Sequence, residues 1–384
     1  MINIPPQIDH LWIDNDTLLA KVCAQASEKS VVALDTEFIR TRTFYPQLGL
    51  IQLYDGQTLS LIDPLSIQDF SPFIALLQAK NVLKVLHACS EDLEVFAHYF
   101  NQLPRPLIDT QVMADFMGFN SSTGFASLIE HYFSISLDKG ASRTDWLARP
   151  LSETQLRYAG ADVYYLLPLF SQMREALPTQ WQSAVMQECD YLCEKCLRQP
   201  QPEQAYLTIG NAWRLQGERL LALKLLAQWR LTLAIEEDIA PNFIIRETAL
   251  FNAAQAMIKQ PSALVEFDVH PQTIRRYGKK IVQLIAQAHK APAESHPPAI
   301  EQIATQASYK KHMKLLQQQL VELVPETITK ERIASRKFLH QLIKWRWYNP
   351  EQDLPLPRLL QGWRQPFGEA LLASYEIAMQ HNAI

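Results

Sequence analysis

Two carboxylates, Asp35 and Glu37, directly follow an apolar run that begins at Val31. If this run forms a β-strand, its side chains alternate, and Asp35 and Glu37 then lie on the same face of the strand. Two negative charges so close together repel each other, and keeping them near the interior is costly unless a cation lies between them. The pair therefore predicts a site for a divalent metal ion. An acidic loop after a strand is the alternative explanation for these two residues alone.

A second acidic position follows residues 81–86, which we expect to form a buried strand. Ser90 is a good N-cap residue and predicts a helix whose first turn contains Glu91 and Asp92. Acidic residues in a first turn also interact favourably with the helix dipole, so this position by itself does not require a metal ion.

A third acidic position lies on a helix that we expect to begin after Ser152, because Ser152 and Gln155 have the spacing of a capping box. Tyr158 and Asp162 are four residues apart and therefore lie one above the other on one face of this helix. Small residues between them, including Gly160, permit close approach to a sheet or a ligand. A tyrosine and an aspartate on an amphipathic helix are also common without any function.

Alternating strand-like and helical segments place all these residues in one α/β domain. Its carboxylates Asp35, Glu37, Asp92 and Asp162 would suit a pair of Mg²⁺ or Mn²⁺ ions, because hard cations prefer oxygen ligands. Two such ions can activate a water molecule and stabilise the leaving oxygen of a phosphodiester. The sequence contains neither the His/Cys spacing of a zinc site nor a glycine-rich phosphate loop.

The strands and helices that position these residues can be predicted from the hydrophobic pattern of the sequence. The sequence has a strand-like pattern up to about residue 65, and the turn at Asp55 and Gly56 predicts a hairpin. The expected strands are 31–38, 48–54, 58–62, 81–86 and 107–109, and the expected helices of this domain are 73–78, 110–117, 125–133, 152–166 and 181–197.

The composition is that of a soluble globular protein with two or three domains: 384 residues, 48% hydrophobic and 20% charged. The net charge of −4 argues against nonspecific coating of nucleic acids. The apolar runs are too short to span a bilayer and the first residues do not resemble a signal peptide, so we expect a cytoplasmic protein that does not associate with membranes.

The cysteines are odd in number, and we expect no disulfide. Cys189, Cys193 and Cys196 have a C-x3-C-x2-C spacing known from iron–sulfur sites. Because they lie in a continuous helical pattern, we expect them to be small apolar residues on one helix face, with a metal cluster as the alternative.

Strand patterns nearly vanish after Pro200, and a Pro-rich linker divides the remainder. We expect domains at residues 1–200, 205–290 and 301–384, with the linker at 291–300. The expected helices after residue 200 are 220–233, 246–258, 271–288, 309–323, 329–343 and 357–379. Basic and aromatic residues are frequent on them, which suits phosphate contact and base stacking but also a solvated basic face.

Residues 34–38, 87–96 and 158–163 together resemble the three motifs of the DEDD superfamily of 3′→5′ exonucleases, tyrosine subclass, and within it the ribonuclease D family. Residues after 200 resemble the HRDC domains of that family, the first more clearly than the second. The resemblance implies an RNase H-like mixed sheet flanked by helices, followed by two small all-α domains. It further implies that Asp35, Glu37, Asp92 and Asp162 bind two divalent metal ions and that Tyr158 positions the attacking water.

The implied activity is 3′→5′ hydrolysis of RNA to nucleoside 5′-monophosphates by a monomer, with transfer-RNA precursors and other small structured RNAs as substrates. A DNA exonuclease and a noncatalytic RNA-binding protein are the alternatives. The candidate substrate contacts are Phe38, Arg42 and His87 beside the motifs, and Arg230, Arg275 and Lys279 in the first HRDC-like domain.

Overall fold

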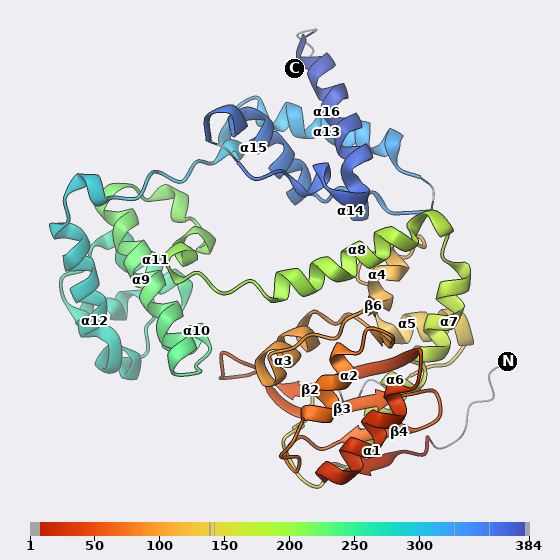
Figure 1. The fold of residues 1–384 in the computed structure, drawn as a ribbon. Helices are drawn as coiled ribbons and strands as arrows, with labels where there is room; N and C mark the ends of the chain where they lie inside the picture. Colours follow the sequence, from red (N-terminus) through yellow and green to blue (C-terminus); the bar gives the residue numbers. More distant parts are fainter. Residues whose placement is uncertain (1–7, 138–139, 142, 326, 353, 381–384) are drawn as a thin grey trace. The chain divides into compact units, whose positions relative to one another are not determined.

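The structure is a computed structural model that describes residues 8–137, 140–141, 143–325, 327–352 and 354–380 (Figure 1). The described chain forms two compact units. The first unit contains residues 8–39, 47–197 and 306–380, and the second contains residues 40–46 and 198–305. We call residues 198–305 the middle helical domain and residues 306–380 the C-terminal helical domain. The predicted domain ends at residues 1 and 384 lie outside the described residues.

A six-stranded mixed sheet in the order β1-β4-β3-β2-β5-β6 forms the centre of the first unit. β3 is antiparallel to its neighbours β2 and β4, whereas β1 pairs with β4, and β5 with β2 and β6, in parallel. This mixed sheet, flanked by helices, confirms the predicted fold class (Figure 1). The strands are β1 (Leu11–Ile13), β2 (Val31–Ile39), β3 (Gln47–Tyr54), β4 (Leu59–Ile62), β5 (Leu83–Leu86) and β6 (Leu107–Asp109).

Eight helices in the described residues between Asp16 and Cys196 flank the sheet, and their buried apolar side chains complete the core around it. They are α1 (Asp16–Ser27), α2 (Ser71–Gln78), α3 (Ser90–Phe100), α4 (Thr110–Asp115), α5 (Phe125–Phe133), α6 (Glu153–Tyr164), α7 (Leu166–Ala176) and α8 (Thr179–Cys196). None of the helices in the described part of the chain combines the length and the apolar character needed to cross a bilayer.

Helix α1 corrects the prediction that the chain is strand-like up to residue 65. The Asn15 side chain accepts a hydrogen bond from the Leu18 N–H at 3.0 Å and caps the helix. The buried residues Leu19, Val22, Cys23 and Ala26 then follow the helical spacing, so one face of α1 enters the core.

Other expected helices also differ in where they begin or end. The residue before α3 is Cys89, not Ser90, and it has no side-chain cap. The helix expected at 152–166 ends at Tyr164, and α7 begins at Leu166. The expected helix 329–343 is two helices, and the expected helix 357–379 begins with two 3₁₀ turns, at Arg358–Leu360 and Gly362–Arg364.

The C-terminal helical domain consists of α13 (Tyr309–Leu323), α14 (Lys330–Ile333), α15 (Arg336–Gln352) and α16 (Gln365–Gln380). It is joined to α8 by a buried ionic centre. The Glu188 carboxylate on α8 is 6% exposed and accepts hydrogen bonds from Arg364, from Arg358 at 2.9 Å and from the Trp363 indole at 2.9 Å. We call Glu188 with these partners and Arg332 the Glu188 centre.

An aromatic cluster lies beside this centre. The Trp363 ring is 5.0 Å from Phe116 and 5.9 Å from Trp181, measured between centroids. The domain is therefore held to the sheet-bearing part of the first unit by apolar packing as well as by charge.

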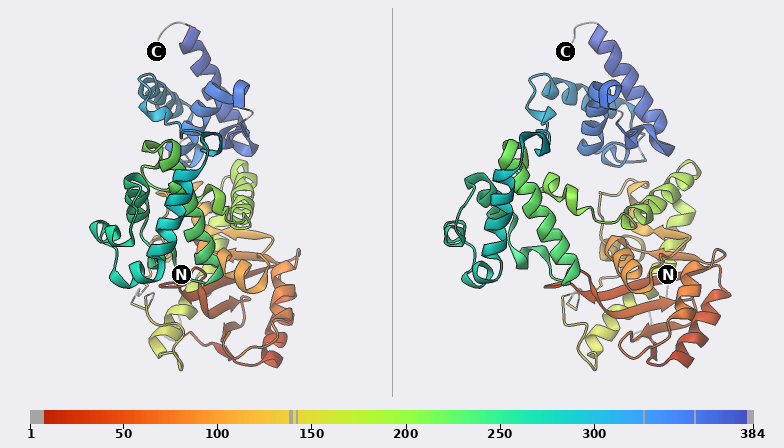
Figure 2. Two further views of the ribbon diagram at one scale, coloured as in Figure 1. Left: turned by 90° about the vertical axis from the view of Figure 1, so that its left-hand side faces the viewer. Right: turned by 60° about the vertical axis from the view of Figure 1, so that its left-hand side comes forward.

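The second unit has an apolar core of its own, built mainly from α9 (Gly217–Glu236), α11 (Glu247–Ala256) and α12 (Pro271–Lys290), with the short α10 (Pro241–Ile244). Leu220, Leu250 and Ile281 in this core are all fully buried. In Figure 2 the green α9 and the teal α12 lie side by side, as their contacts require. Residues 40–46 belong to this unit, where Phe44 packs against the core.

Two of the three cysteines of α8, Cys189 and Cys193, are buried as predicted, whereas Cys196 is half-buried. Cys189 and Cys193 are essentially inaccessible, and the Cys189 sulfur accepts a hydrogen bond from the Asp109 N–H at 3.3 Å. The described residues whose ligand atoms lie close enough together to hold a metal ion are Asp35, Glu37 and Asp162, and these cysteines are not among them.

Candidate active site

Strand β2 presents the first two carboxylates. Asp35 and Glu37 are both half-buried and lie on the same face of the strand, as the alternation predicts. β3 pairs with β2 at both carboxylates, opposite Asp35 and Glu37, whereas the parallel pairing of β5 with β2 ends at Ala33, before them. The β2–β3 register shifts between Glu37 and Phe38, so the regular pairing is interrupted directly after Glu37.

Helix α6 crosses this face of the sheet and brings the third carboxylate. Its start is fixed by the predicted capping box, in which Ser152 and Gln155 bond reciprocally. Asp162 lies one turn after Tyr158 on α6. Oxygen atoms of Asp35, Glu37 and Asp162 all lie within 4.8 Å of one another.

Asp92 reaches the site from the first turn of α3. The loop before this helix is held by Asp109, whose carboxylate accepts hydrogen bonds from the Ala88 N–H at 2.9 Å and the Cys89 N–H at 3.0 Å. Asp92 is buried, and its carboxylate accepts a hydrogen bond from the Thr36 hydroxyl. It lies outside the group of three, so the structure brings three of the four predicted carboxylates together and places the fourth beside them.

We call Asp35, Glu37, Asp92 and Asp162 the acidic cluster. Their carboxylates are crowded, and the negative charges repel one another. Burial, followed by repulsion from Asp92, Asp162 and Glu37, raises the pKa of Asp35 well above its usual value. Burial and the same kind of repulsion raise the pKa of Glu37 to about 9.

The other two carboxyls have partly compensating hydrogen bonds. Burial raises the pKa of Asp162 to about 7, although its hydrogen bond with Tyr158 opposes the rise. Burial also raises the pKa of Asp92 to about 6 against the effect of the Thr36 hydroxyl. At all four carboxyls, burial dominates the shift, and no described Lys or Arg is among its main causes.

The donor set fits a hard divalent cation. Closely spaced carboxylate oxygens with an excess of negative charge are the ligands that Mg²⁺ and Mn²⁺ prefer. A bound cation would also remove the repulsion that raises these pKa values.

The Tyr158 hydroxyl is hydrogen-bonded to the Asp162 side chain. Burial and the nearby negative charges raise the pKa of Tyr158, so its hydroxyl keeps its proton. A protonated hydroxyl can orient a water molecule but cannot act as a general base. The ring is held by Trp146, at 6.2 Å between centroids.

The predicted substrate contacts differ in where they lie. Phe38 is half-buried beyond the register shift. The His87 Nδ1 lies 2.9 Å from the Thr110 hydroxyl, and burial lowers the pKa of His87. Arg42 is exposed within the second unit, with its guanidinium 5.9 Å from the Phe243 ring centroid.

In the middle helical domain, Arg275 and Lys279 are exposed one turn apart on α12. Arg230 requires a correction. Its guanidinium is buried and donates to the Ile245 carbonyl at 3.2 Å and to Glu247 at 3.3 Å, so it is not free to contact a phosphate.

Sequence reasoning missed the residues that support the site from a distance. Arg149 donates to Asp63 and to the Gly49 carbonyl, both at 2.6 Å, and to the Trp146 carbonyl at 3.0 Å. These bonds fix the loop from which Trp146 reaches Tyr158. A pair 86 residues apart leaves no local pattern in the sequence. Thr36, in contrast, could have been noticed as the hydroxyl between the two carboxylates.

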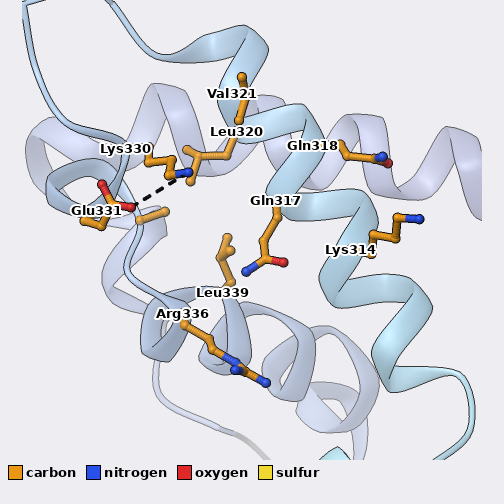
Figure 3. A pocket seen from close by; sticks show the side chains of 10 residues that line it. Lys314, Gln317, Gln318, Leu320, Val321, Lys330, Glu331, Arg336 and Leu339 are labelled. Carbon is orange, nitrogen blue, oxygen red and sulfur yellow. Dashed lines mark ion pairs between the residues drawn. The ribbon is translucent and has the colours of Figure 1, made fainter.

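A separate cavity of about 460 Å³ lies in the C-terminal helical domain between α13 and the α14–α15 segment. Lys314, Lys330 and Arg336 line it, with Glu331 as its acidic member. Figure 3 shows Gln317 pointing into the space and the ion pair of Lys330 with Glu331, whose charged atoms are 3.9 Å apart. The cavity is mainly cationic and shares no residue with the acidic cluster.

Comparison with protein families divides the chain in a similar way. A family model described as 3′–5′ exonuclease matches residues 11–178. An HRDC domain model matches residues 220–285, and a model described as ribonuclease D, C-terminal HRDC domain, matches residues 307–372.

Individual proteins match over nearly the whole chain. Ribonuclease D of Haemophilus influenzae is 47% identical over 364 residues, which are 94% of this chain and 91% of that protein. Ribonuclease D of Escherichia coli is 44% identical over 363 residues, 93% of this chain and 96% of that protein. The crystal structure of Escherichia coli RNase D, an exoribonuclease involved in structured RNA processing, superposes with a TM-score of 0.91 at 41% identity, covering 96% of this chain and 99% of that one. The catalytic core of RRP6 from Trypanosoma brucei shares the fold at 18% identity, with a TM-score of 0.60 over 74% of this chain and 83% of that one.

Proposed function

The chain belongs to the ribonuclease D family of 3′→5′ exoribonucleases, and on that premise we propose that it hydrolyses RNA with two divalent metal ions and releases nucleoside 5′-monophosphates. The observation that carries the proposal is the acidic cluster: oxygen atoms of Asp35, Glu37 and Asp162 lie within 4.8 Å of one another. Cations from outside the chain are the natural complement of such a site.

The residues divide the work as follows. Asp35 and Asp162 would hold one ion, and Asp35 with Glu37 and the adjacent Asp92 the other. When bound, the two ions would supply a water of lowered pKa and offset the charge that develops on the departing 3′-oxygen.

The remaining steps belong to the side chains. The Tyr158 hydroxyl, which is hydrogen-bonded to Asp162 and stays protonated, orients the attacking water toward the phosphorus. Trp146 packs beside the Tyr158 ring and limits its movement. The Thr36 hydroxyl holds the Asp92 carboxylate in place.

We propose that the substrates are transfer-RNA precursors and other small structured RNAs. The description of the Escherichia coli relative as an enzyme of structured RNA processing supports this. Exposed Arg275 and Lys279 on α12 and the cationic cavity of the C-terminal helical domain would contact phosphates upstream of the 3′ end.

We also propose that the enzyme is a cytoplasmic monomer. Its five cysteines are free thiols, which suits a reducing compartment. Sedimentation of the purified protein at several concentrations checks the oligomeric state.

The test is digestion of a transfer-RNA precursor labelled at its 5′ end, with Mg²⁺, Mn²⁺ or chelator, resolved at single-nucleotide steps. We expect stepwise shortening from the 3′ end with either metal ion and none with chelator, and nucleoside 5′-monophosphates as products. A DNA oligonucleotide of matching sequence, run in parallel, tests the alternative that DNA is the preferred polymer. Internal cleavage, or shortening that proceeds in chelator, would contradict the proposal.

A further inference from the structure

Gln52 is a buried amide in the middle of the sheet. The side chain is fully buried, and neither its amide oxygen nor its nitrogen has a hydrogen-bond partner among the described residues. An unsatisfied buried polar group costs about 1–3 kcal/mol, and such groups are rare in native proteins. Gln52 therefore calls for a functional explanation.

The strand register places Gln52 opposite the acidic cluster. On β3 it is paired directly with Asp35 on β2. Directly paired residues point to the same face of a sheet, with Cβ atoms about 4.5–5.5 Å apart. The Gln52 amide is thus within reach of the Asp35 carboxylate.

Helix α6 covers the same face. Tyr54, two residues after Gln52 on β3 and hence on the same face, meets Tyr164 of α6 with ring centroids 5.4 Å apart. Helix α6 also carries Tyr158 and Asp162. Gln52 therefore lies on the face of the sheet that α6 closes over the acidic cluster.

The other carboxylates show what Asp35 lacks. Asp92 is hydrogen-bonded by the Thr36 hydroxyl, and Asp162 by the Tyr158 hydroxyl. Asp35 has a backbone hydrogen bond from Thr36 but no comparable side-chain donor among the main causes of its pKa shift. Carboxylates that bind metal ions are usually oriented by such outer hydrogen bonds.

We propose that Gln52 is a positioning residue of the metal centre and that its amide N–H donates to the Asp35 carboxylate when divalent ions are bound. The inference rests on the proposed two-ion function and adds a residue to it. Because the carboxylate is then held by the ions on one side and by Gln52 on the other, the amide fixes the direction in which Asp35 presents its oxygens.

The alternative is that Gln52 only fills space in the sheet. The two roles predict different results for Gln52→Met, which keeps the length of the side chain but removes the amide. Because the amide makes no hydrogen bond to any described residue, its removal should leave the melting temperature in chelator unchanged or higher. Loss of the outer hydrogen bond should weaken divalent-ion binding by about tenfold to a hundredfold.

The experiment measures thermal unfolding in chelator and the dissociation constant for Mn²⁺ by calorimetry, for the full-length wild type, Gln52→Met and Ser60→Ala. Ser60 is a matched control, because it is buried in β4 and paired with Leu53, on the opposite face from Gln52. We expect Ser60→Ala to bind Mn²⁺ like the wild type.

Each outcome has a distinct meaning. Weaker Mn²⁺ binding by Gln52→Met with undiminished metal-free stability supports the proposal. Wild-type Mn²⁺ affinity in Gln52→Met overturns it, whatever the melting temperature does. A wild type that takes up no divalent ion overturns the two-ion function itself, and with it the role of Gln52.

Discussion

The first unit contains two buried acidic centres that are opposite in their charge balance. In the acidic cluster, carboxylates face one another, and burial and repulsion raise their pKa values. At the Glu188 centre one carboxylate meets three arginines, Arg332, Arg358 and Arg364. Burial opposes ionisation there too, but hydrogen bonds and charge from Arg364, with help from Trp363 and Arg358, hold the pKa of Glu188 below its usual value.

The difference teaches how to distinguish a binding site from a structural contact. Where the chain supplies the counter-charge itself, the buried carboxylate joins two parts of the fold. Where the chain supplies no positive counter-charge, the buried carboxylates can bind a cation from solution.

The largest expected effect comes from neutralising one carboxylate of the acidic cluster. For Asp162→Asn we expect kcat to fall by about a thousandfold or more, which is about 4 kcal/mol of transition-state stabilisation, together with weaker metal binding. Its metal-free melting temperature should not fall, because a repulsive charge has been removed. Steady-state kinetics and unfolding in chelator check both. Wild-type turnover with unchanged metal affinity would remove Asp162 from the site.

Neutralising Glu188 should have the reverse effect on stability. Glu188→Gln leaves buried arginines without their carboxylate, and we expect it to lower the free energy of unfolding by about 3–5 kcal/mol. Denaturant unfolding measures the change. Glu322→Gln is the control, because Glu322 is exposed on α13 and should change stability by no more than about 0.5 kcal/mol. Equal stability of the two variants would show that the Glu188 centre contributes little.

Tyr158→Phe tests the role of the uncharged hydroxyl that is hydrogen-bonded to Asp162. Removing the hydroxyl should lower kcat by about a hundredfold with little change in RNA binding, because the water loses its orientation. Kinetics with short RNA oligonucleotides, together with a direct binding measurement, separate the two quantities. A change confined to KM would make Tyr158 a substrate contact instead.

The two centres should also respond to pH in opposite directions. Glu37 and Asp162 have folded pKa values of about 9 and about 7, above their unfolded values, so the folded chain holds extra protons. Their contribution to stability is complete below about pH 4 and is lost as the pH rises toward 9. We expect the melting temperature in chelator to fall over this range, and the rise produced by Mn²⁺ to increase with pH.

Glu188 has the opposite sign. Its folded pKa is lowered, so its contribution is present above the unfolded pKa and is lost as the pH falls through the folded one. In Glu188→Gln the loss of stability on acidification should therefore be smaller than in the wild type, and in Asp162→Asn the loss on alkalinisation should be smaller. Identical pH profiles for both variants and the wild type would contradict the comparison.

The smallest expected effect concerns cations that remain exposed. The C-terminal helical domain, counted over residues 306–384, has eleven Lys and Arg against seven Asp and Glu, but three of its arginines belong to the Glu188 centre. Lys314→Gln at the cavity should lower the salt dependence of structured-RNA binding by about one phosphate contact and leave hydrolysis of a short oligonucleotide unchanged. Arg332→Gln, by contrast, should act on stability.

Local patterns predicted the parts of the site that depend on local geometry. The common face of Asp35 and Glu37 follows from strand alternation, and the stacking of Tyr158 and Asp162 follows from helical spacing. Helix α1 was missed because its apolar residues were read as part of a strand-rich segment, although Asn15 is a good capping residue.

Interactions between distant segments could not be predicted in this way. Arg230 has the same local sequence features as an RNA-binding arginine, and only the fold reveals Ile245 and Glu247 around its guanidinium. Glu188 is one acidic residue among several on α8 until residues 332–364 pack over it. The unsatisfied amide of Gln52 is likewise a property of the packed sheet, because the sequence shows only one polar residue in an apolar strand.

The Glu188 centre also has a consequence for the order of synthesis. Glu188 precedes its three arginines by 144, 170 and 176 residues. At roughly 5–20 residues per second, the ribosome needs roughly 7–35 s to make that stretch, and until then the carboxylate and the aromatic rings of Trp181 and Phe116 lack their covering partners. A nascent chain that terminates early never acquires them and remains a substrate for chaperones and proteases. Closure of the Glu188 centre thus requires that translation has passed Arg364.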